Sequence, residues 1–417
     1  MPGGRTTHSR FKIPIDANES SECTMSKQSG AAELLRRSKL FIWDEAPMAK
    51  RWAIENVDKL LKDVMGNDQD FGGKVVVFGG DFRQVLPVVP KATIHQTISA
   101  SLVRSYLWTR MKTFRLTINM RAKNDTEFSE FLLRVGNGEE PTDTEGNIRI
   151  PEEMIVKYDN EEDSIKRLIR AIFPSLNTRA HSADYMTGRA ILAAKNEHVD
   201  RLNETLISLF PGEEKIFNSF DEAVDDTHNY YEEEFLNSLT PNGLPPHKLV
   251  SKKTCPIILL RNLDPSNGLC NGTRMVCREF RDNLIDAQIM FGQHSGKHVF
   301  IPRIPLSPAE HEGYPFQFRR KQFPIRLCFA MTINKAQGQT IPNVEVYLPQ
   351  SVFSHGQLYV ALSRGTSMST TKVLIKPDTN NIRGKIWTKN VVYKQVYIAD
   401  LRKIISVEKL WRRSEDA

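Results

Sequence analysis

The chain has 417 residues, of which 40% are hydrophobic and 26% charged, an ordinary composition for a globular protein of about two to four domains. It contains no run of about eighteen apolar residues, and its first residues lack an apolar core, so we expect neither a membrane span nor a secretory signal. Five cysteines without a C-x-x-C pair exclude a disulfide scaffold, disfavour a zinc finger and indicate a reducing compartment.

The net charge of +7 is unevenly distributed. Residues 251–336 carry thirteen Lys or Arg against six Asp or Glu, an excess equal to that of the whole chain. Residues 139–163 and 213–234 are strongly acidic instead. A focused basic region suits a polyanion such as nucleic acid, and a merely basic soluble protein is the alternative.

Strands and helices are predicted to alternate along much of the chain. Short apolar runs are typical of strands covered on both faces of a parallel sheet, and they occur at Leu40–Trp43, Lys74–Phe78 and Arg189–Ala194. Apolar residues at helical spacing predict helices over 52–65, ending at Gly66, and over 196–209. This alternation indicates an α/β architecture.

The middle of the chain has a different pattern. Residues 137–165 and 211–247 are acidic and rich in Asn, Gly and Pro, which favours surface linkers or an insertion. Residues 272–305 alternate apolar and polar side chains, as in the β-hairpins of a small barrel. A further strand is expected at Thr371–Lys376.

Polar residues follow the first two predicted strands. Asp44 and Glu45 come directly after the first strand, at the sheet edge where ligands bind in open α/β folds. One carboxylate can hold the water shell of Mg²⁺ and the next can accept a proton from an attacking water. Gln84 follows the second strand and could orient a water or contact a terminal phosphate. A plain Asp-Glu strand end and an exposed Gln are the simpler alternatives.

Two arginines and a glycine-containing segment complete the candidate chemistry. Arg121 ends Leu-Thr-Ile-Asn-Met-Arg, and Arg364 ends Tyr-Val-Ala-Leu-Ser-Arg. An arginine across a cleft can stabilise charge during phosphoryl transfer, although most arginines are solvated surface groups. Residues 332–340 place Lys, Gln and Thr around Gly338, a set that suits phosphate and sugar contacts.

These segments in this order resemble the petite-integration-frequency type of superfamily 1B DNA helicase, particularly its plant and Helitron-associated branch. The resemblance is carried by Phe-Ile-Trp-Asp-Glu-Ala-Pro, Gly-Gly-Asp-Phe-Arg-Gln-Val-Leu-Pro-Val, Thr-Ile-Asn-Met-Arg, Ala-Met-Thr-Ile-Asn-Lys-Ala-Gln-Gly-Gln-Thr and Tyr-Val-Ala-Leu-Ser-Arg. The opening residues 3–12 are similar to that family's DNA-contacting motif Ia.

The resemblance implies a fold and a set of domains. Two RecA-like lobes of the P-loop NTPase class would clamp ATP, with a small SH3-like β insertion in the second lobe. The first, incomplete lobe is expected over 1–136, an acidic helical linker over 137–185, and the second lobe over 186–417. The second lobe would contain an acidic insertion near 211–247 and the SH3-like insertion near 272–322.

The resemblance also implies a function and roles for residues. Members are ATP-driven 5′ to 3′ motors on single-stranded DNA that open duplexes and duplex junctions. Asp44 would hold Mg²⁺ through water, Glu45 would activate the hydrolytic water, and Gln84 would sense the γ-phosphate. Arg121 and Arg364 would stabilise the charge of the transition state. Gly338 and Arg364 would contact the nucleotide. DNA contacts are expected at Thr6, His8, Thr332, Lys335, Arg319, Arg320 and Lys321.

The resemblance further implies work in DNA repair, recombination and telomere maintenance. We expect an intracellular protein of the nucleus, with the mitochondrion as the alternative. The oligomeric state is left open by the sequence.

One expected motif is missing from these 417 residues. A P-loop reads G-x-x-x-x-G-K-[ST], and the nearest phrase, Gly72-Gly73-Lys74, continues into a strand. In the family the P-loop lies upstream of the segment that begins here, so we hypothesise an N-terminal truncation. Weakened triphosphate binding, unpaired first-lobe strands and exposed apolar faces would follow. The alternative function is an ATP-independent nucleic-acid-binding remnant of a helicase.

Other sites are less well supported by the sequence. His294 and His298 offer two ligands, whereas a zinc site needs three or four. Phe316 and Phe318, next to three basic residues, could stack on bases or simply alternate in a strand.

Overall fold

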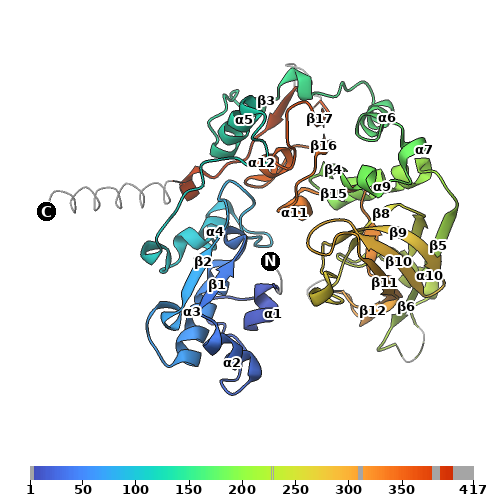
Figure 1. The fold of residues 1–417 in the computed structure, drawn as a ribbon. Helices are drawn as coiled ribbons and strands as arrows, with labels where there is room; N and C mark the ends of the chain where they lie inside the picture. The colour runs from blue at the N-terminus through green and yellow to red at the C-terminus, as the bar shows by residue number, and fades with distance from the viewer. Residues whose placement is uncertain (1–3, 227, 229, 309–312, 378–385, 398–417) are drawn as a thin grey trace.

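The computed structural model describes residues 4–226, 228, 230–308, 313–377 and 386–397 (Figure 1). We refer to residues 4–121 as the first lobe, to 214–327 as the insertion, and to the rest up to residue 376 as the second lobe. No helix in the described ranges is long and apolar enough to cross a membrane.

The first lobe contains a small parallel sheet with helices against one face. Its strands are β1 (Leu40–Trp43) and β2 (Val75–Phe78), and its helices are α1 (Thr7–Phe11), α2 (Gly30–Arg37), α3 (Arg51–Met65) and α4 (Ile94–Ser99). The predicted helix over 52–65 is α3, which buries Ile54, Val57, Leu61 and Val64 and ends at Gly66 in the left-handed region. A capping box between Thr93 and Gln96 starts α4.

The two strands predicted in the first lobe are present as β1 and β2. The prediction that both of their faces are buried is wrong. Each pairs only with the other among the described residues. Phe41, Trp43, Val76 and Phe78 face the first-lobe core. The opposite face exposes Leu40 (49%), Ile42 (50%), Val75 (61%) and Val77 (49%), because no described segment packs against it.

The second lobe is built on a four-stranded parallel sheet in the order β15-β4-β16-β17. Its strands are β4 (Arg189–Ala193), β15 (Ala330–Thr332), β16 (Asn343–Leu348) and β17 (Thr371–Ile375). The helices of this lobe are α5 (Thr126–Asn137), α6 (Glu161–Ile172), α7 (Leu176–Arg179), α8 (Ala183–Thr187), α9 (Asn196–Leu209), α11 (Ile333–Ala336) and α12 (Gln357–Leu362). The predicted strand at 189 and the predicted helix over 196–209 are both present.

The position of α5 bears on the predicted domain boundary at residue 136. Phe128, Phe131, Leu132 and Val135 of α5 pack into the same core as the second-lobe sheet. This packing argues for a first lobe that ends near Arg121. The stretch expected as an acidic linker also contains β3 (Asn147–Arg149), which pairs with β18 (Trp387–Lys389) near the described C-terminal end.

The insertion is antiparallel, as the alternating pattern predicted, but it is longer than expected. A five-stranded sheet has the order β11-β10-β9-β8-β14, a three-stranded sheet has the order β12-β13-β6, and β5 pairs with β7. Its elements are β5 (Glu214–Asn218), β6 (Phe220–Ala223), α10 (Glu233–Ser238), β7 (Lys248–Lys252), β8 (Pro256–Leu259), β9 (Arg274–Arg281), β10 (Leu284–Ile289), β11 (His298–Pro302), β12 (Ile304–Leu306), β13 (Phe318–Gln322) and β14 (Ile325–Leu327). The acidic stretch 211–247 therefore supplies strands of the insertion and is not a plain linker.

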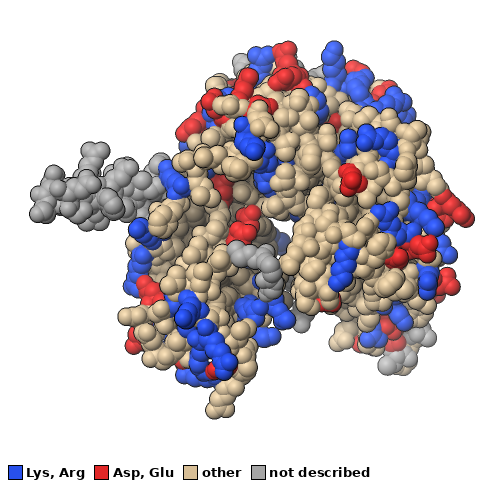
Figure 2. Space-filling view, in the orientation of Figure 1, with Lys and Arg blue, Asp and Glu red and all other residues tan. Residues whose placement is uncertain are grey.

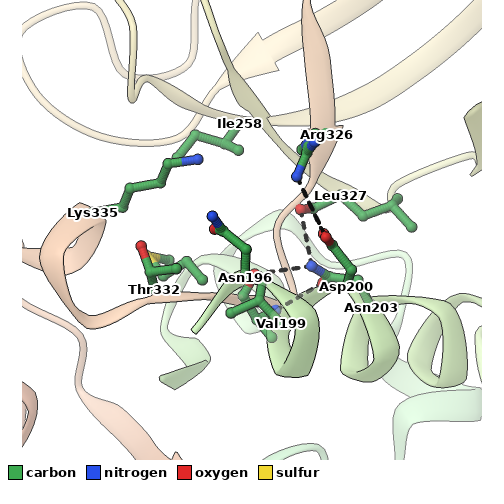
Figure 3. Close-up of a pocket in the computed structure, with 11 residues that line it drawn as sticks. Asn196, Val199, Asp200, Asn203, Ile258, Arg326, Leu327, Thr332 and Lys335 are labelled. Atoms are coloured by element: carbon green, nitrogen blue, oxygen red, sulfur yellow. Dashed lines mark hydrogen bonds and ion pairs between the residues drawn. The ribbon is translucent and has the colours of Figure 1, made fainter. Parts of the chain in front are cut away.

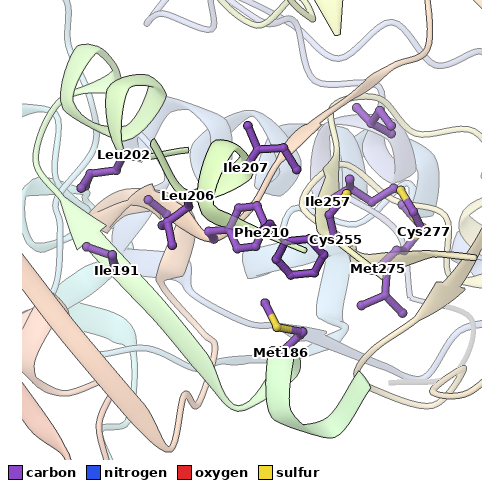
Figure 4. Close-up of a cluster of buried hydrophobic side chains, with 14 of the residues drawn as sticks. Met186, Ile191, Leu202, Leu206, Ile207, Phe210, Cys255, Ile257, Met275 and Cys277 are labelled. Atoms are coloured by element: carbon purple, nitrogen blue, oxygen red, sulfur yellow. The ribbon is translucent and has the colours of Figure 1, made fainter. Parts of the chain in front are cut away.

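The insertion shares its core with the second lobe (Figure 4). Leu202 and Leu206 of α9 and the following Phe210 lie in one cluster with Ile257 and Met275 of the insertion. A continuous apolar core resists relative movement of the two parts, because separating them would expose it to water. The insertion is thus anchored firmly to the lobe that carries Arg364 and Lys335.

Candidate nucleotide and nucleic-acid sites at the lobe interface

The ends of β1 and β2 meet at one point of the first lobe. The Gly79 N–H donates to the Trp43 carbonyl at 2.8 Å, and the Ala46 N–H donates to the Gly79 carbonyl at 2.9 Å. Gly80 is required here because a Cβ on it would lie 2.1 Å from Cδ of Pro47. Asp44 and Glu45 therefore lie beside the loop that carries Gln84, as expected for the carboxyl ends of parallel strands.

The Glu45 carboxylate faces the second lobe. Nε2 of Gln337 donates a hydrogen bond to its Oε2 at 3.2 Å. Burial raises the pKa of Glu45, and the negative charges of Asp44 and Asp81 raise it further, while Gln337 and Arg364 act in the opposite direction. A carboxylate with a raised pKa binds a proton more readily, which suits a group that accepts a proton from water.

Arg364 lies buried at the same interface, only 2% exposed. Its guanidinium donates to the carbonyls of Val360 (2.9 Å) and Gln339 (3.1 Å) and to the Ser363 hydroxyl (2.9 Å). Burial, followed by the nearby charge of Arg121, lowers the pKa of Arg364 to about 10. A cation held by neutral acceptors retains an unbalanced positive charge, which would attract an anion in the cleft.

Arg121 crosses from the first lobe to the second. Its Nε donates to Oγ1 of Thr340 at 2.9 Å and its Nη1 donates to the Ser363 carbonyl at 2.7 Å. Both acceptors belong to segments that sequence analysis had singled out for Gly338 and Arg364. The structure thus brings together Glu45, Arg121, Gly338 and Arg364, which are far apart in sequence.

Buried amide oxygens at the interface lack hydrogen-bond partners. In the described part of the chain, the side-chain oxygens of Gln84, Gln337 and Gln339 are buried without a donor. Buried acceptors of this kind indicate a missing polar group, such as water or a ligand. This observation fits a polar ligand at the cleft, and it extends the set of candidate residues to Gln337 and Gln339.

Asp44 and Glu45 could hold Mg²⁺ together with water and phosphate oxygens, but not in a cage made of protein ligands alone. The described residues contain no group of three His, Cys, Asp or Glu that could form a protein cage for a metal. Magnesium in nucleotide sites is commonly held by one or two carboxylates together with water and phosphate oxygens. Asp44 is exposed at the strand end and meets that requirement. The absence of such a group also gives no support to a zinc site at His294 and His298.

A small cavity lies on the second lobe beside the insertion (Figure 3). Asn196, Thr332 and Lys335 line it together with Ile258 of β8. Burial, and then the charge of Arg326, lowers the pKa of the Lys335 ammonium. Across the cavity, Arg326 pairs with Asp200 at 3.3 Å.

Asn203 fixes the strand that leads to Thr332. Its side chain accepts from the Ala330 N–H at 2.9 Å and donates to the Ala330 carbonyl at 3.1 Å and the Leu327 carbonyl at 3.3 Å. Thr332 then ends β15 and precedes α11, which carries Lys335. The cavity thus presents an amide, a hydroxyl and an ammonium, which are groups that contact phosphate backbones.

The predicted contacts in motif Ia lie on the first lobe. Thr6 precedes α1 without a side-chain capping bond. His8 is in α1, and its pKa is lowered by burial and by Lys50. The space-filling view shows a hollow between the first lobe and the insertion, with basic side chains on both sides (Figure 2).

The three basic residues of β13 do not share one environment. Arg319 and Lys321 are on the outer face, where Arg319 pairs with Glu222. Arg320 is fully buried and forms bidentate bonds with Asp221 at 2.9 Å and 2.6 Å. It also donates to the carbonyls of Pro245 and Leu239. The predicted DNA contact by Arg320 is therefore wrong, because its donors are already used inside the protein.

Known proteins resemble both halves of this chain. A family model described as PIF1-like helicase matches residues 1–146. Another, described as DNA helicase Pif1, 2B domain, matches residues 234–280. The chain is 25% identical over 373 residues to ATP-dependent DNA helicase PIF1 of Xenopus laevis, covering 89% of the chain and 52% of that relative. The chain is thus similar to PIF1-like helicases in two separate segments, and to this relative over most of its length.

Another ATP-dependent DNA helicase matches over a similar part of the chain. ATP-dependent DNA helicase RRM3 of Saccharomyces cerevisiae is 26% identical over 451 residues, which covers 89% of this chain and 56% of that relative. The chain therefore spans about half the length of these curated relatives.

Solved PIF1-like helicases share the fold. The crystal structure of Pif1 helicase from Bacteroides in complex with ADP-AlF3 and ssDNA matches with a TM-score of 0.67 at 21% identity, over 97% of this chain and 84% of that one. Pif1 helicase from Candida albicans matches with a TM-score of 0.62 at 22% identity, over 91% and 78%. The α/β fold with RecA-like lobes is thus confirmed.

Some residues of the interface between the lobes were missed by sequence analysis. Gln337 lies inside a segment that was singled out, and its contact with Glu45 was not foreseen. Tyr359 donates its hydroxyl proton to Asp81 at 2.9 Å across the two lobes. Its position five residues before Arg364, in the same motif, was the available signal.

Proposed function

We propose that this chain is the motor part of an ATP-dependent DNA helicase that moves 5′ to 3′ on single-stranded DNA and opens duplexes. The observation that carries the proposal is the meeting of Glu45, Gln337, Arg121 and Arg364 at one interface between two lobes. An acid, an amide and two arginines from different lobes are the groups that phosphoryl transfer requires.

Each residue has a separate task in this proposal. Bound ATP would supply the free energy of hydrolysis of its terminal phosphoanhydride bond. Glu45 accepts a proton from the attacking water, and Asp44 would hold Mg²⁺ through its water shell. Arg121 and Arg364 stabilise negative charge from opposite sides of the cleft, and Gln84 lies where it can contact the terminal phosphate. Gly338 lies next to Glu45 and has a φ of 77°, a left-handed conformation that favours glycine.

We further propose that these 417 residues alone hydrolyse ATP weakly. Their sequence contains no G-x-x-x-x-G-K-[ST] segment, which supplies the main phosphate cradle in P-loop enzymes. The alternative function, an ATP-independent DNA-binding remnant, shares the DNA contacts and lacks the hydrolysis.

Single-stranded DNA and duplex junctions are the proposed partners. The cavity with Asn196, Thr332 and Lys335 is the proposed phosphate contact on the second lobe. Thr6 and His8 are the proposed contacts on the first lobe, and Arg319 and Lys321 those on the insertion. Two of the similar structures support this proposal, because they are described as Bacteroides Pif1 bound to ssDNA and as Pif1 helicases coordinating at forked dsDNA.

Some finer assignments rest on the sequence motifs. We assign the chain to the plant and Helitron-associated branch. We propose that it acts in the nucleus in DNA repair, recombination and telomere maintenance. The mitochondrion is the alternative compartment.

ATP hydrolysis with and without single-stranded DNA tests this function. We expect weak, DNA-stimulated hydrolysis that becomes undetectable in Arg364→Ala, because removing a transition-state arginine lowers the rate by about a thousandfold or more. Glu45→Gln, which keeps the hydrogen bond to Gln337 feasible, should also abolish it. If hydrolysis is unchanged in both variants, the assigned site is wrong.

DNA binding is measured in parallel by fluorescence anisotropy. Salt-dependent binding without hydrolysis would favour the ATP-independent remnant. Absence of both activities would reject both functions for these 417 residues.

A further inference from the structure

A segment near the described C-terminal end begins on the second lobe. β18 pairs with β3, and Nδ2 of Asn390 donates to the Val135 carbonyl at 2.9 Å. Val391 packs against the second-lobe core, and its carbonyl accepts from the Gly356 N–H at 3.1 Å. These contacts fix the segment to the lobe that carries Arg364.

The same segment then reaches the first lobe. Val396 is fully buried in the first-lobe core, where Tyr393 packs beside it. The Tyr397 hydroxyl lies 2.9 Å from the Gly136 carbonyl and 3.3 Å from the Phe82 carbonyl. Residues 390–397 therefore span the interface between the lobes and end beside the loop that leads to Gln84.

His355 lies between this segment and the first lobe and is only 1% exposed. Its Nε2 is 2.7 Å from the Phe82 carbonyl, and its Nδ1 accepts from the Tyr393 N–H at 2.9 Å. Because Nδ1 is an acceptor, Nε2 carries the proton and donates to Phe82. The imidazole ring also stacks on Tyr393, with ring centroids 5.2 Å apart.

The neighbouring turn of the second lobe holds the rest of the loop. Tyr359 hydrogen-bonds to Asp81, as described above. Gly356 has φ 72° and comes so close to the loop that a Cβ on it would lie 2.3 Å from the Arg83 carbonyl oxygen. The loop of residues 80–84 is thus fixed from across the cleft and not only by its own lobe.

We propose that His355 is a positioning residue for the loop of residues 80–84, which it holds from the second lobe, and that residues 390–397 act as a strap that keeps His355 in place. The inference rests on the proposed function, because the loop carries Gln84 and borders Glu45. In that function His355 would transmit the relative position of the lobes to the residue that contacts the terminal phosphate.

Hydrogen exchange of the full chain tests this role without nucleotide or DNA. His355→Leu keeps apolar volume but removes both hydrogen bonds, whereas His355→Gln can still donate and accept. We expect His355→Leu to speed exchange of the Gly79, Arg83 and Gln84 amides about tenfold, and His355→Gln to restore much of the protection. Tyr397→Phe should speed the same amides less, and the exposed control Tyr230→Phe should leave them unchanged.

Two outcomes would overturn the proposal. If loop exchange in His355→Leu equals that of the unchanged protein, the hydrogen bonds do not position the loop. If Gln and Leu variants speed exchange equally and the α3 amides open with them, His355 is only a packing residue of the fold. Because the readout needs no ATP hydrolysis, failure of the motor function would leave this test decisive.

Discussion

Arg319 and Arg320 are neighbours in sequence and lie in different chemical environments. The pair of Arg320 with Asp221 has both side chains fully buried, whereas the pair of Arg319 with Glu222 leaves them 42% and 40% exposed. A buried cation that loses its partner remains desolvated, while an exposed one is solvated by water. The two pairs therefore form a matched comparison of buried and exposed charge.

Asp221→Asn should destabilise the insertion strongly. We expect a loss of about 3–5 kcal/mol in its local free energy of unfolding, because the Arg320 charge would stay buried without a counter-charge. Glu222→Gln, the control on the same strand, should cost less than about 1 kcal/mol. Hydrogen exchange of the β6 and β13 amides in increasing denaturant measures both values. Equal effects would mean that the burial of Arg320 does not matter for stability.

The sequence was sufficient to predict that Arg320 points inward, but it was not sufficient to predict the partner of Arg320. In β13 the alternation places Phe318, Arg320 and Gln322 on the buried face and Arg319 on the other. Reading Arg319, Arg320 and Lys321 as one basic patch ignored that period of two. Asp221, however, lies 99 residues away in sequence, and no local pattern relates it to Arg320.

At the scale of elements, local sequence predicted segments better than their surroundings. The helix over 196–209 and the strand at Leu40–Trp43 have the expected bounds, because apolar spacing and the residues at their ends are local signals. Burial of β1 was predicted wrongly because it depends on what else joins the sheet. The expected exposure of apolar faces, in contrast, is seen at Ile42 and Val77.

Ile42→Thr combined with Val77→Thr should reduce binding of a hydrophobic dye such as ANS to this chain. Both side chains lie on the exposed face of the β1–β2 sheet, paired in register, and Thr retains the strand preference of a β-branched residue. The free energy of unfolding should change by less than about 0.5 kcal/mol, since little buried contact is lost. The control, Ile216→Thr with Val224→Thr, replaces apolar residues of the insertion that are exposed at separate places, one in β5 and one directly after β6. An equal loss of dye binding in the control would show that this face is not a distinct apolar patch.

At the scale of the whole molecule, the order of the motifs predicted which residues would lie at one site. It did not predict the individual contacts between the two lobes. Glu45 and Arg364 were expected at one site and do approach each other there. The contact of Tyr359 with Asp81 and that of His355 with Phe82 depend on the packing of two lobes against each other. Such contacts join residues separated by more than 270 positions, for which single-sequence patterns hold no information.

The distribution of charge over both lobes leads to a prediction about DNA binding. Each phosphate contact by a Lys or Arg releases counterions, so the affinity for single-stranded DNA should fall steeply with salt. Lys335→Ala should weaken binding and reduce the salt slope by about 1, because one cation at the cavity would be lost. Lys335→Arg should keep most of the slope. Lys166→Ala, which removes an exposed lysine of α6 paired with Glu162, is the matched control.

Anisotropy titrations of a labelled oligonucleotide at several salt concentrations give these slopes. A slope reduced in Lys335→Ala and unchanged in Lys166→Ala would assign the cavity to the DNA path. Equal slopes in all three variants would remove Lys335 from that path, because a phosphate contact cannot be lost without changing counterion release. The measurement is independent of ATP, so it tests the DNA site whether or not these 417 residues hydrolyse nucleotide.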